Sequence, residues 1–228
     1  MRSMPVGIVT GASRGLGLAL ARALDERGWR LVVDARGGAA LAEATSGLTG
    51  VTAIPGDVAD AGHRSALVDA AGDQIDLVVN NASLLGPSPQ PALADYPLET
   101  LREVYDANVF GPLALLQLAL PRLAGDAAVL NITSDAGVEP YEGWGGYGSS
   151  KAALEQLTAI LAAEHPALRV YWVDPGDMRT RMHQDAFPGE DISDRPPPEE
   201  SVPGLLALIE GSLPSGRYQA RELAQVPR

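Results

Sequence analysis

The chain has 228 residues, of which 46% are hydrophobic and 20% charged, as in a globular protein with a sizeable core. Its formal net charge of -12 is repelled by nucleic acid and by anionic membranes, so neither is an expected partner. Cysteine is absent, which excludes disulfides, thiolate catalysis and cysteine-bound metals. No apolar run is long enough for a membrane span or a signal-peptide core, so we expect a cytoplasmic protein.

Strand-like and helix-like segments alternate along the first three quarters of the chain. Short apolar runs predict strands at 6–9, 29–33, 51–54, 75–79, 127–132 and 168–173, with a last strand opening at 216. Apolar residues at helical spacing predict helices at 16–27, 63–71, 98–123, 147–164 and 202–210, the third with a kink at Gly111-Pro112. This alternation favours a single α/β domain over 1–228, doubly wound around a mostly parallel sheet.

One irregular segment, 178–200, interrupts this order and is rich in proline and acidic residues. Long loops inside compact domains are more often functional than idle. We therefore expect a substrate lid over a site at the strand ends, with an ordinary surface loop as the alternative.

A glycine-rich turn joins the first predicted strand to the first helix. It contains Gly11, Ser13, Arg14, Gly15, Leu16 and Gly17. Small residues let the backbone approach a pyrophosphate, and the following helix N-terminus presents free N–H groups to it. Glycines also serve as plain turn residues, so the position between strand and helix is what favours nucleotide binding.

The end of the second predicted strand gives opposite indications about the nucleotide. Asp34 suggests an acid that bonds ribose hydroxyls, whereas Arg36 suggests a partner for a 2′-phosphate. Arg14 in the glycine-rich turn adds a second cation, although both arginines could be plain surface residues. The balance favours NADP(H), with NAD(H) as the other possibility.

A tyrosine and a lysine four residues apart point to acid–base chemistry. Tyr147 and Lys151 share one face of a predicted helix, and Ser134 follows the preceding strand. A phenol with a pKa of about 10 needs a neighbouring ammonium to work near neutral pH. A serine hydroxyl can hold the substrate oxygen. Taken singly, the pair could be a packing pair and the serine a helix cap.

Taken together, these motifs closely resemble the classical short-chain dehydrogenase/reductase family over 6–221. The residues that carry the resemblance occur in the family's order: Thr10-Gly11-x-x-x-Gly15-x-Gly17, Asn80-Asn81-Ala82, Asn108, Ser134, Tyr147-x-x-x-Lys151, Pro175-Gly176 and Thr180. The resemblance implies a Rossmann-type domain with a seven-stranded sheet. It also implies an oxidoreductase that moves hydride between NADP(H) and a carbonyl or alcohol.

The resemblance also implies a role for each matching residue. Tyr147 would be the acid in reduction and the base in oxidation, Ser134 would polarise the carbonyl, and Asn108 would hold a water in the proton relay. Lys151 would bond the nicotinamide ribose and lower the pKa of Tyr147. Further cofactor contacts would come from Asp57, Val58, Asn81, Ala82, Pro175, Gly176 and Thr180, in addition to the glycine-rich turn. No metal site is expected.

Two comparisons with the family pattern bear on specificity. The acid that selects NAD in the family would fall at Ala35, and Arg36 stands where members preferring NADP carry a basic residue. Ser83 replaces the glycine that usually follows Asn-Asn-Ala, a change we expect to be tolerated. The chain is also shorter than many members in its lid and C-terminal region.

Three segments would surround the substrate in this family: 84–90, 137–146 and 177–195. Their apolar residues favour a hydrophobic carbonyl compound, although Tyr141 and Trp144 could equally only pack the loop. These apolar residues are Leu84, Leu85, Val138, Tyr141, Trp144, Met178, Met182 and Phe187. A solvated loop is the favoured interpretation of Arg179, Arg181 and His183. Helices 98–123 and 147–164 would pair copies into a homodimer or homotetramer.

Three other functions compete with this interpretation. A cofactor-sensing regulator would keep the glycine-rich turn but has no need of Ser134, Tyr147 and Lys151 at catalytic spacing. A sugar-nucleotide epimerase or dehydratase normally needs a larger C-terminal domain. A serine hydrolase lacks support, because there is no Gly-x-Ser-x-Gly motif and none of the three histidines has a triad setting.

Overall fold

A parallel sheet of seven strands forms the middle layer of the computed structural model, which describes residues 4–224. The strands are β1 (Val6–Val9), β2 (Arg30–Ala35), β3 (Val51–Pro55), β4 (Ile75–Asn80), β5 (Leu123–Ile132), β6 (Arg169–Asp174) and β7 (Gly216–Gln219). They lie in the order β3-β2-β1-β4-β5-β6-β7, and every neighbouring pair is parallel. The expected doubly wound α/β domain is confirmed, with the strand order reversing between β1 and β4.

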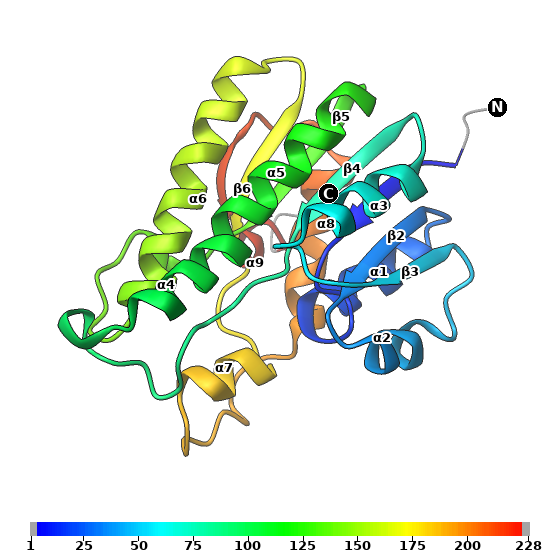
Figure 1. Cartoon of the computed structure of the whole chain (residues 1–228). Helices are drawn as coiled ribbons and strands as arrows, with labels where there is room; N and C mark the ends of the chain where they lie inside the picture. The colour runs from blue at the N-terminus through cyan, green and yellow to red at the C-terminus, as the bar shows by residue number, and fades with distance from the viewer. Residues whose placement is uncertain (1–3, 225–228) are drawn as a thin grey trace.

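Helices cover both faces of this sheet (Figure 1). They are α1 (Gly15–Asp25), α2 (Gly38–Thr45), α3 (Ala61–Ala71), α4 (Leu98–Tyr105), α5 (Gly111–Ala119), α6 (Gly145–Glu164), α7 (Arg181–Ala186), α8 (Val202–Glu210) and α9 (Ala220–Ala224). One core lies between the sheet and α1, α2 and α8, and the other lies between the sheet and α3, α5 and α6. Successive strand residues serve opposite cores: Ile8 packs towards α3 and α5, and Val9 towards α1 and α8.

The long helix expected at 98–123 is divided in the structure. α4 is followed by a π-helical segment at Asp106–Phe110 and then by α5. Pro112 has no N–H for the carbonyl of Asn108, which explains why the regular pattern fails just before it. The predicted end of this helix is wrong, because Leu123 already belongs to β5. Asn108 therefore lies in an irregular turn.

Three short helices, α2, α7 and α9, were not predicted. α2 begins at Gly38, directly after Gly37, and has only two buried residues, so its sequence carries little amphipathic signal. α7 lies within the irregular segment 178–200, where Thr180 caps it by accepting a hydrogen bond from the His183 N–H. Within residues 4–224, no helix combines the length and apolar character that crossing a membrane requires.

Candidate active site

A cleft of ≈ 720 Å³ opens at the carboxyl ends of the strands, where the strand order reverses. Most predicted cofactor and catalytic residues border it: Gly11, Ser13, Arg14, Gly15, Leu16, Arg36, Asp57, Val58, Asn81, Ala82, Tyr147, Lys151, Pro175 and Thr180. Four do not: Gly17, Asn108, Ser134 and Gly176. One cleft thus brings together segments from both halves of the chain.

The glycine-rich turn has the close packing that a phosphate cradle needs. A Cβ on Gly11 would lie 2.8 Å from the Cα of Ala82, and its φ of +72° favours glycine. A Cβ on Gly17 would lie 2.4 Å from the Gly11 carbonyl oxygen, so Gly17 serves helix packing instead of bordering the cleft. No side chain caps the N-terminus of α1 among the described residues. Its free N–H groups fit a pyrophosphate.

Asp34 binds the backbone of this turn. It is 1% exposed; its Oδ1 accepts a hydrogen bond from the Gly11 N–H at 2.7 Å, and its Oδ2 lies 2.9 Å from Nε2 of His63. Burial raises the pKa of Asp34, and the bonds to Gly11 and His63 oppose that rise. Both carboxylate oxygens are therefore engaged inside the protein, which removes the conflict between Asp34 and Arg36 seen in the sequence.

Arg14 and Arg36 both border the cleft, both are exposed, and neither forms an ion pair with another described residue. Guanidinium groups that have no carboxylate partner in the protein can bind a phosphate in a bidentate manner. The two cations expected from the sequence therefore border the same cleft.

The ends of two further strands also border the cleft. Asp57 and Val58 follow β3 and border the cleft, and Asn81 and Ala82 do so after β4. Asn81 also donates from Nδ2 to the carbonyls of Thr10 and Gly11, which ties β4 to the glycine-rich turn. Asn80 points elsewhere and donates to Asn131 Oδ1 at 2.7 Å, which joins β4 to β5.

Tyr147 and Lys151 are buried side by side in the first turns of α6. The Lys151 Nζ lies 5.4 Å from the centroid of the Tyr147 ring and donates to the Ile132 carbonyl at 2.8 Å. Ile132 ends β5, so this bond fixes α6 against the strand end. The i,i+4 spacing has the geometry that the sequence predicted.

Burial shifts the pKa values of this pair in opposite directions. It raises the pKa of Tyr147, as do the charges of Asp174 and Asp135, whereas the hydroxyls of Ser83 and Ser134 act to lower it. It lowers the pKa of Lys151 to about 7, against the opposing charge of Glu155. The lowering of the tyrosine pKa by Lys151, which the resemblance implies, stays a prediction.

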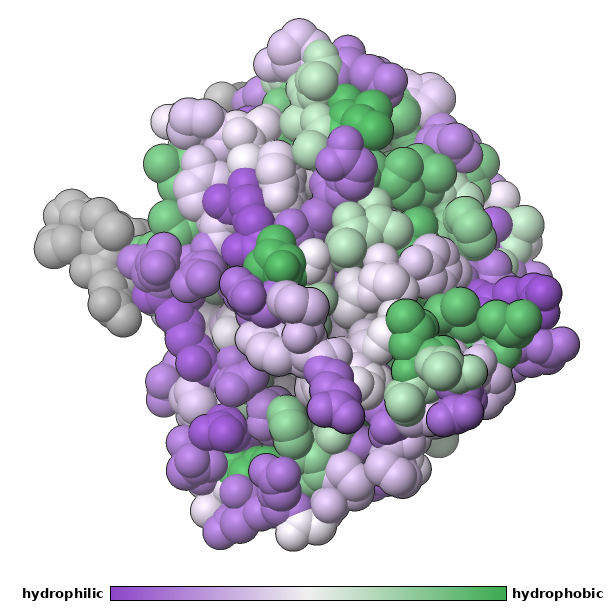
Figure 2. All heavy atoms as spheres, turned by 90° about the vertical axis from the view of Figure 1, so that its left-hand side faces the viewer, coloured by the Kyte–Doolittle hydropathy of each residue, from purple (hydrophilic) through white to green (hydrophobic). Residues whose placement is uncertain are grey.

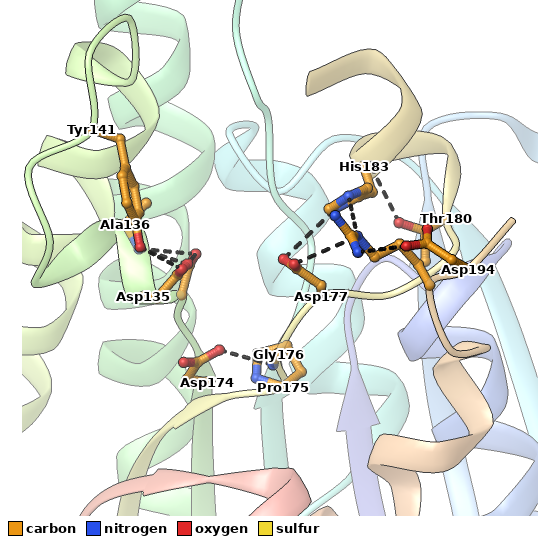
Figure 3. A network of polar contacts seen from close by, with 12 residues as sticks. Asp135, Ala136, Tyr141, Asp174, Pro175, Gly176, Asp177, Thr180, His183 and Asp194 are labelled. Carbon is orange, nitrogen blue, oxygen red and sulfur yellow. Dashed lines mark hydrogen bonds and ion pairs between the residues drawn. The ribbon is translucent and has the colours of Figure 1, made fainter. Parts of the chain in front are cut away.

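Asp135 and Tyr141 belong to a polar network at the end of β5 (Figure 3). The Ser134 hydroxyl donates to Asp135 Oδ1 at 2.8 Å, and Tyr141 donates to Oδ2 of the same carboxylate at 2.9 Å. Nearby, Asp174 accepts from the Gly176 N–H at 2.8 Å, so Gly176 lies in a turn that follows β6. The hydrogen of Ser134 is thus engaged by a carboxylate.

Asn108 is fully buried, and its side chain is fully hydrogen-bonded. Its Nδ2 donates to the Leu84 carbonyl and to Ser150 Oγ, both at 2.9 Å, and its Oδ1 accepts from the Leu84 N–H at 2.7 Å and Ser83 Oγ at 3.1 Å. The side chain thus holds segment 83–84 against α6. The relay water that the resemblance assigns to Asn108 stays a prediction.

Four of the apolar residues expected around a substrate border the cleft: Leu84, Leu85, Met178 and Met182. Arg179 and Arg181 of segment 178–200 border it as well. Val138 and Tyr141 are exposed instead. Six lid residues between 178 and 185, and Pro198, border the cleft, which fits a cover over the site.

Trp144 and Phe187 pack behind this lining. The Trp144 ring lies 5.8 Å from that of Tyr147 and 5.7 Å from that of Phe187, and neither Trp144 nor Phe187 borders the cleft. This resolves the ambiguity over Trp144 in favour of packing. His183 is also packed, with its ring 4.9 Å from Phe187 and its side chain 11% exposed, so the expectation of a solvated position is wrong for this residue.

Ser83 and Asp135 were missed as site residues by the sequence analysis. Ser83 borders the cleft and bonds Asn108, and Asp135 bonds Ser134. The sequence shows Ser83 where the family pattern has glycine, but its contact with Asn108 could not be predicted because the two residues are 25 positions apart. Among residues 4–224, no group of three or more histidine and acidic side chains is arranged to hold a metal ion.

Comparison with known proteins agrees with this geometry. The family model for short chain dehydrogenase matches residues 5–191. A benzil reductase ((S)-benzoin forming) of Saccharomyces cerevisiae is 32% identical over 197 residues, which cover 78% of this chain and 73% of that protein. The 3-oxoacyl-acyl-carrier-protein reductase of rhamnolipid biosynthesis from Pseudomonas aeruginosa is 35% identical over 192 residues, which cover 78% of this chain and 74% of that protein.

Solved structures agree over nearly the whole chain. A short chain dehydrogenase of Shigella flexneri 2a complexed with NADP has a TM-score of 0.88 at 26% identity and covers 95% of this chain and 97% of its own. A short chain dehydrogenase from Pseudomonas syringae has a TM-score of 0.88 at 31% identity and covers 95% of this chain and 94% of its own. The fold, the family model and these relatives together show that the chain belongs to the classical short-chain dehydrogenase/reductase family, whose members are oxidoreductases with nicotinamide cofactors.

Proposed function

We propose that this oxidoreductase is an NADP(H)-dependent reductase of apolar ketones or aldehydes that also catalyses the reverse oxidation. The observation that carries the proposal is the shared cleft. Tyr147, Lys151, Arg14 and Arg36 all border it, as does the glycine-rich turn that leads into the uncapped N-terminus of α1. This lining supports a site that combines acid–base chemistry with phosphate binding.

The chain's own residues would bind the cofactor along this cleft. The N–H groups at the start of α1 would hold the pyrophosphate, and Arg14 and Arg36 would hold a 2′-phosphate. Asp57 and Val58 would contact the adenine, Asn81 and Ala82 its ribose, and Lys151 the nicotinamide ribose. Pro175 and Thr180 would contact the nicotinamide, where the bound cofactor supplies or accepts a hydride.

Proton transfer falls to Tyr147. In reduction its phenol would give a proton to the carbonyl oxygen as the carbonyl carbon gains hydride, and in oxidation its phenolate would take the proton back. Ser134 would orient the carbonyl oxygen once its hydroxyl turns from Asp135 towards the substrate. Lys151, fixed on the Ile132 carbonyl, would hold α6 and the ribose in register. Leu84, Leu85, Met178 and Met182 favour an apolar substrate.

The reaction is tested by following NADPH consumption with a panel of ketones, aldehydes and quinones. We expect turnover by the wild-type protein and a loss of about 10³-fold or more in Tyr147→Phe, because removal of a positioned acid costs most of its catalytic contribution. NADPH binding should remain within about threefold of wild type. Equal turnover by both proteins would contradict the proposed role of Tyr147.

Cofactor preference is tested by titrating NADPH and NADH against wild type and Arg36→Ala. We expect NADPH to bind more tightly to wild type, and the substitution to weaken NADPH about tenfold, as loss of one charged hydrogen bond does. NADH affinity should stay the same. Arg102→Ala, which removes an exposed arginine of α4, is the matched control. Equal loss of both cofactors in Arg36→Ala would contradict a contact with the 2′-phosphate.

A further inference from the structure

The chain around the end of β5 is held by two side chains that the proposed reaction does not use, Glu155 of α6 and Arg217 of β7. The Thr133 hydroxyl donates to Glu155 Oε1 at 2.8 Å. The Nη2 of Arg217 donates to the Ser134 carbonyl at 3.3 Å. Thr133 borders the cleft, whereas Glu155 and Arg217 do not. The two side chains therefore hold the wall of the cleft without reaching the cleft itself.

One guanidinium joins these contacts. The Nε of Arg217 lies 3.1 Å from Oε1 and 3.2 Å from Oε2 of Glu155, so the carboxylate fixes this side of the planar group. The Nη2 is then aimed at the Ser134 carbonyl and also lies 3.9 Å from Asp174 Oδ2. The side chains of Arg217 and Glu155 are 25% and 11% exposed, and hydrogen bonds so withdrawn from water are stronger.

Glu155 also contacts the turn that follows Ser134. A Cβ on Gly137 would lie 3.1 Å from Glu155 Oε1, so the carboxylate packs closely against that glycine. Ser134 begins this turn, since its Oγ accepts from the Ala136 N–H at 3.2 Å. The pair of Arg217 and Glu155 thus holds the backbone before Ser134, at its carbonyl and after it.

These contacts are not needed to attach β7 to the sheet. β7 pairs with β6 through the backbone, with Arg217 opposite Trp172. Because β6 lies between β5 and β7, the Arg217 side chain reaches across a strand to meet Ser134. The Ser134 carbonyl also accepts from the Gly137 N–H at 3.0 Å, so it is not left unsatisfied when Arg217 is removed. The guanidinium therefore adds an extra constraint on Ser134.

We propose that Arg217, held by Glu155, is a positioning residue that fixes the backbone of Ser134 so that the serine hydroxyl meets the substrate carbonyl oxygen. The role rests on the proposed oxidoreductase function, in which Ser134 orients that oxygen. Arg217 touches no reacting atom and acts through Ser134. Misplacing a group by about 1 Å can slow a reaction about 100-fold, so partial loss of this constraint has a measurable effect.

The role predicts that loss of Arg217 matters only while the Ser134 hydroxyl is present. Arg217→Met keeps a long side chain and removes the guanidinium, so kcat/KM for ketone reduction should fall about tenfold. NADPH affinity should stay within about twofold of wild type, because Arg217 does not border the cleft. In a Ser134→Ala background, Arg217→Met should slow the reaction less than about twofold, since the hydroxyl that it positions is already absent.

The experiment is a double-mutant cycle of kcat/KM with wild type, Arg217→Met, Ser134→Ala and the double variant, using the best ketone of the panel. Single turnovers with NADPH-bound enzyme in excess of ketone keep slow variants measurable. Arg27→Met, which removes the Arg27–Glu210 ion pair, is the matched control for loss of a guanidinium.

A second variant covers the case in which Arg217→Met does not fold, as judged by circular dichroism. Glu155→Gln keeps an acceptor for the Thr133 hydroxyl and removes the charge that binds Arg217. It enters the same cycle with Ser134→Ala. A smaller loss, of about threefold, is expected, again only where the Ser134 hydroxyl is present.

Each outcome decides a claim. A loss confined to the proteins that retain Ser134 supports the positioning role. An equal loss in both backgrounds, wild-type activity in Arg217→Met, or wild-type activity in Ser134→Ala overturns the role and leaves the proposed function standing. A loss in Arg27→Met as large as in Arg217→Met overturns it too, because the effect is then not specific. If wild type turns over no substrate of the panel, the proposed function fails, and the positioning role falls with it.

Discussion

Lys151 is the only lysine in the chain. The other sixteen of its seventeen lysine and arginine residues are arginines. It is 2% exposed, and burial lowers its pKa to about 7. Arginine cannot lose its proton in a protein, whereas a buried lysine can. The only lysine of the chain, whose pKa is lowered by burial, is thus the one placed beside Tyr147.

A single lysine makes this pKa directly measurable. With lysine carrying ¹³C at Cε, the NMR spectrum contains one lysine signal and can be followed from pH 6 to pH 10. We expect a midpoint at about 7 in the free protein. A midpoint near 10, the ordinary value, would contradict the burial that the structure assigns to this side chain.

The same shift makes stability depend on pH. The folded state holds Lys151 neutral above about pH 7, whereas the unfolded chain stays protonated up to about 10.5. The unfolded state therefore binds more protons in this window, so the free energy of unfolding rises with pH from about 7 towards 10.5. Lys151→Met should be about 1 kcal/mol more stable than wild type at pH 7. Denaturant unfolding should show wild type gaining stability relative to Lys151→Met between pH 7 and pH 9.5, enough to close this difference and reverse it. A difference in the free energy of unfolding that stays constant with pH would argue against it.

Sequence spacing predicted the residues that lie close together along the chain. Tyr147 and Lys151 are neighbours because one helix turn separates them, and any helix would have placed them so. Spacing could not predict the bonds of Asp34 to His63 or of Ser83 to Asn108, since each joins residues from different elements. Nor could it give the pKa of Tyr147, which depends on burial and on acids from β6 and the end of β5.

At the scale of elements, segments with a strong apolar pattern were predicted at the right place in the chain, and helices with a weak pattern were missed. The buried strands and α8 lie where their apolar runs placed them, whereas α2 and the six-residue α7 carry too little pattern to be found. The predicted kink at Gly111-Pro112 was near the real irregularity, because the missing N–H of Pro112 affects the turn before it. The residues of that turn matter for function, since it holds Asn108.

The segment 178–200 is attached to the rest of the site through aromatic packing. Phe187 follows α7 and meets Trp144 at 5.7 Å and His183 at 4.9 Å, and Met182 packs beside Tyr147. We propose that these contacts hold the segment closed as a substrate lid. Phe187 would then act on substrate binding without touching the substrate.

Phe187→Ala tests this proposal. An aromatic pair contributes about 1 kcal/mol beyond its buried area, so the KM for the carbonyl substrate should rise about fivefold. NADPH affinity should change less, because Phe187 does not border the cleft. Steady-state kinetics with both substrates varied separates the two effects, and Phe187→Tyr, which keeps the ring, serves as the control. A KM within error of wild type in Phe187→Ala would refute the lid role.

At the scale of the molecule, the helices α4, α5 and α6 expose more apolar surface than a solvated face needs. Leu98, Phe110, Leu118 and Ile160 are between 41% and 62% exposed on these helices and on the π-helical segment. Figure 2 shows the side of the molecule that lies to the left in Figure 1, with hydrophobic residues gathered in several patches among polar ones. We propose that two copies of the chain associate through this helical face, as a homodimer or half of a homotetramer.

Ile160→Glu tests the association. The substitution places like charges opposite one another in a symmetric interface, at a cost of several kcal/mol, so self-association should weaken about 100-fold or more. Leu213→Glu makes the same change at an exposed site before β7 and should leave the assembly intact. Sedimentation velocity at micromolar concentration gives the result. A wild-type protein that sediments only as a monomer would end this proposal.

The central claim is that this cleft transfers hydride between NADPH and a carbonyl carbon with Tyr147 supplying the proton. The most direct test is a single turnover with NADPH that carries deuterium at the transferable nicotinamide position, using the best ketone of the panel. We predict that mass spectrometry will find one deuterium on the new carbinol carbon, and none above background with Tyr147→Phe although it binds NADPH. An alcohol formed without deuterium, or no alcohol from any carbonyl despite tight NADPH binding, would contradict the claim.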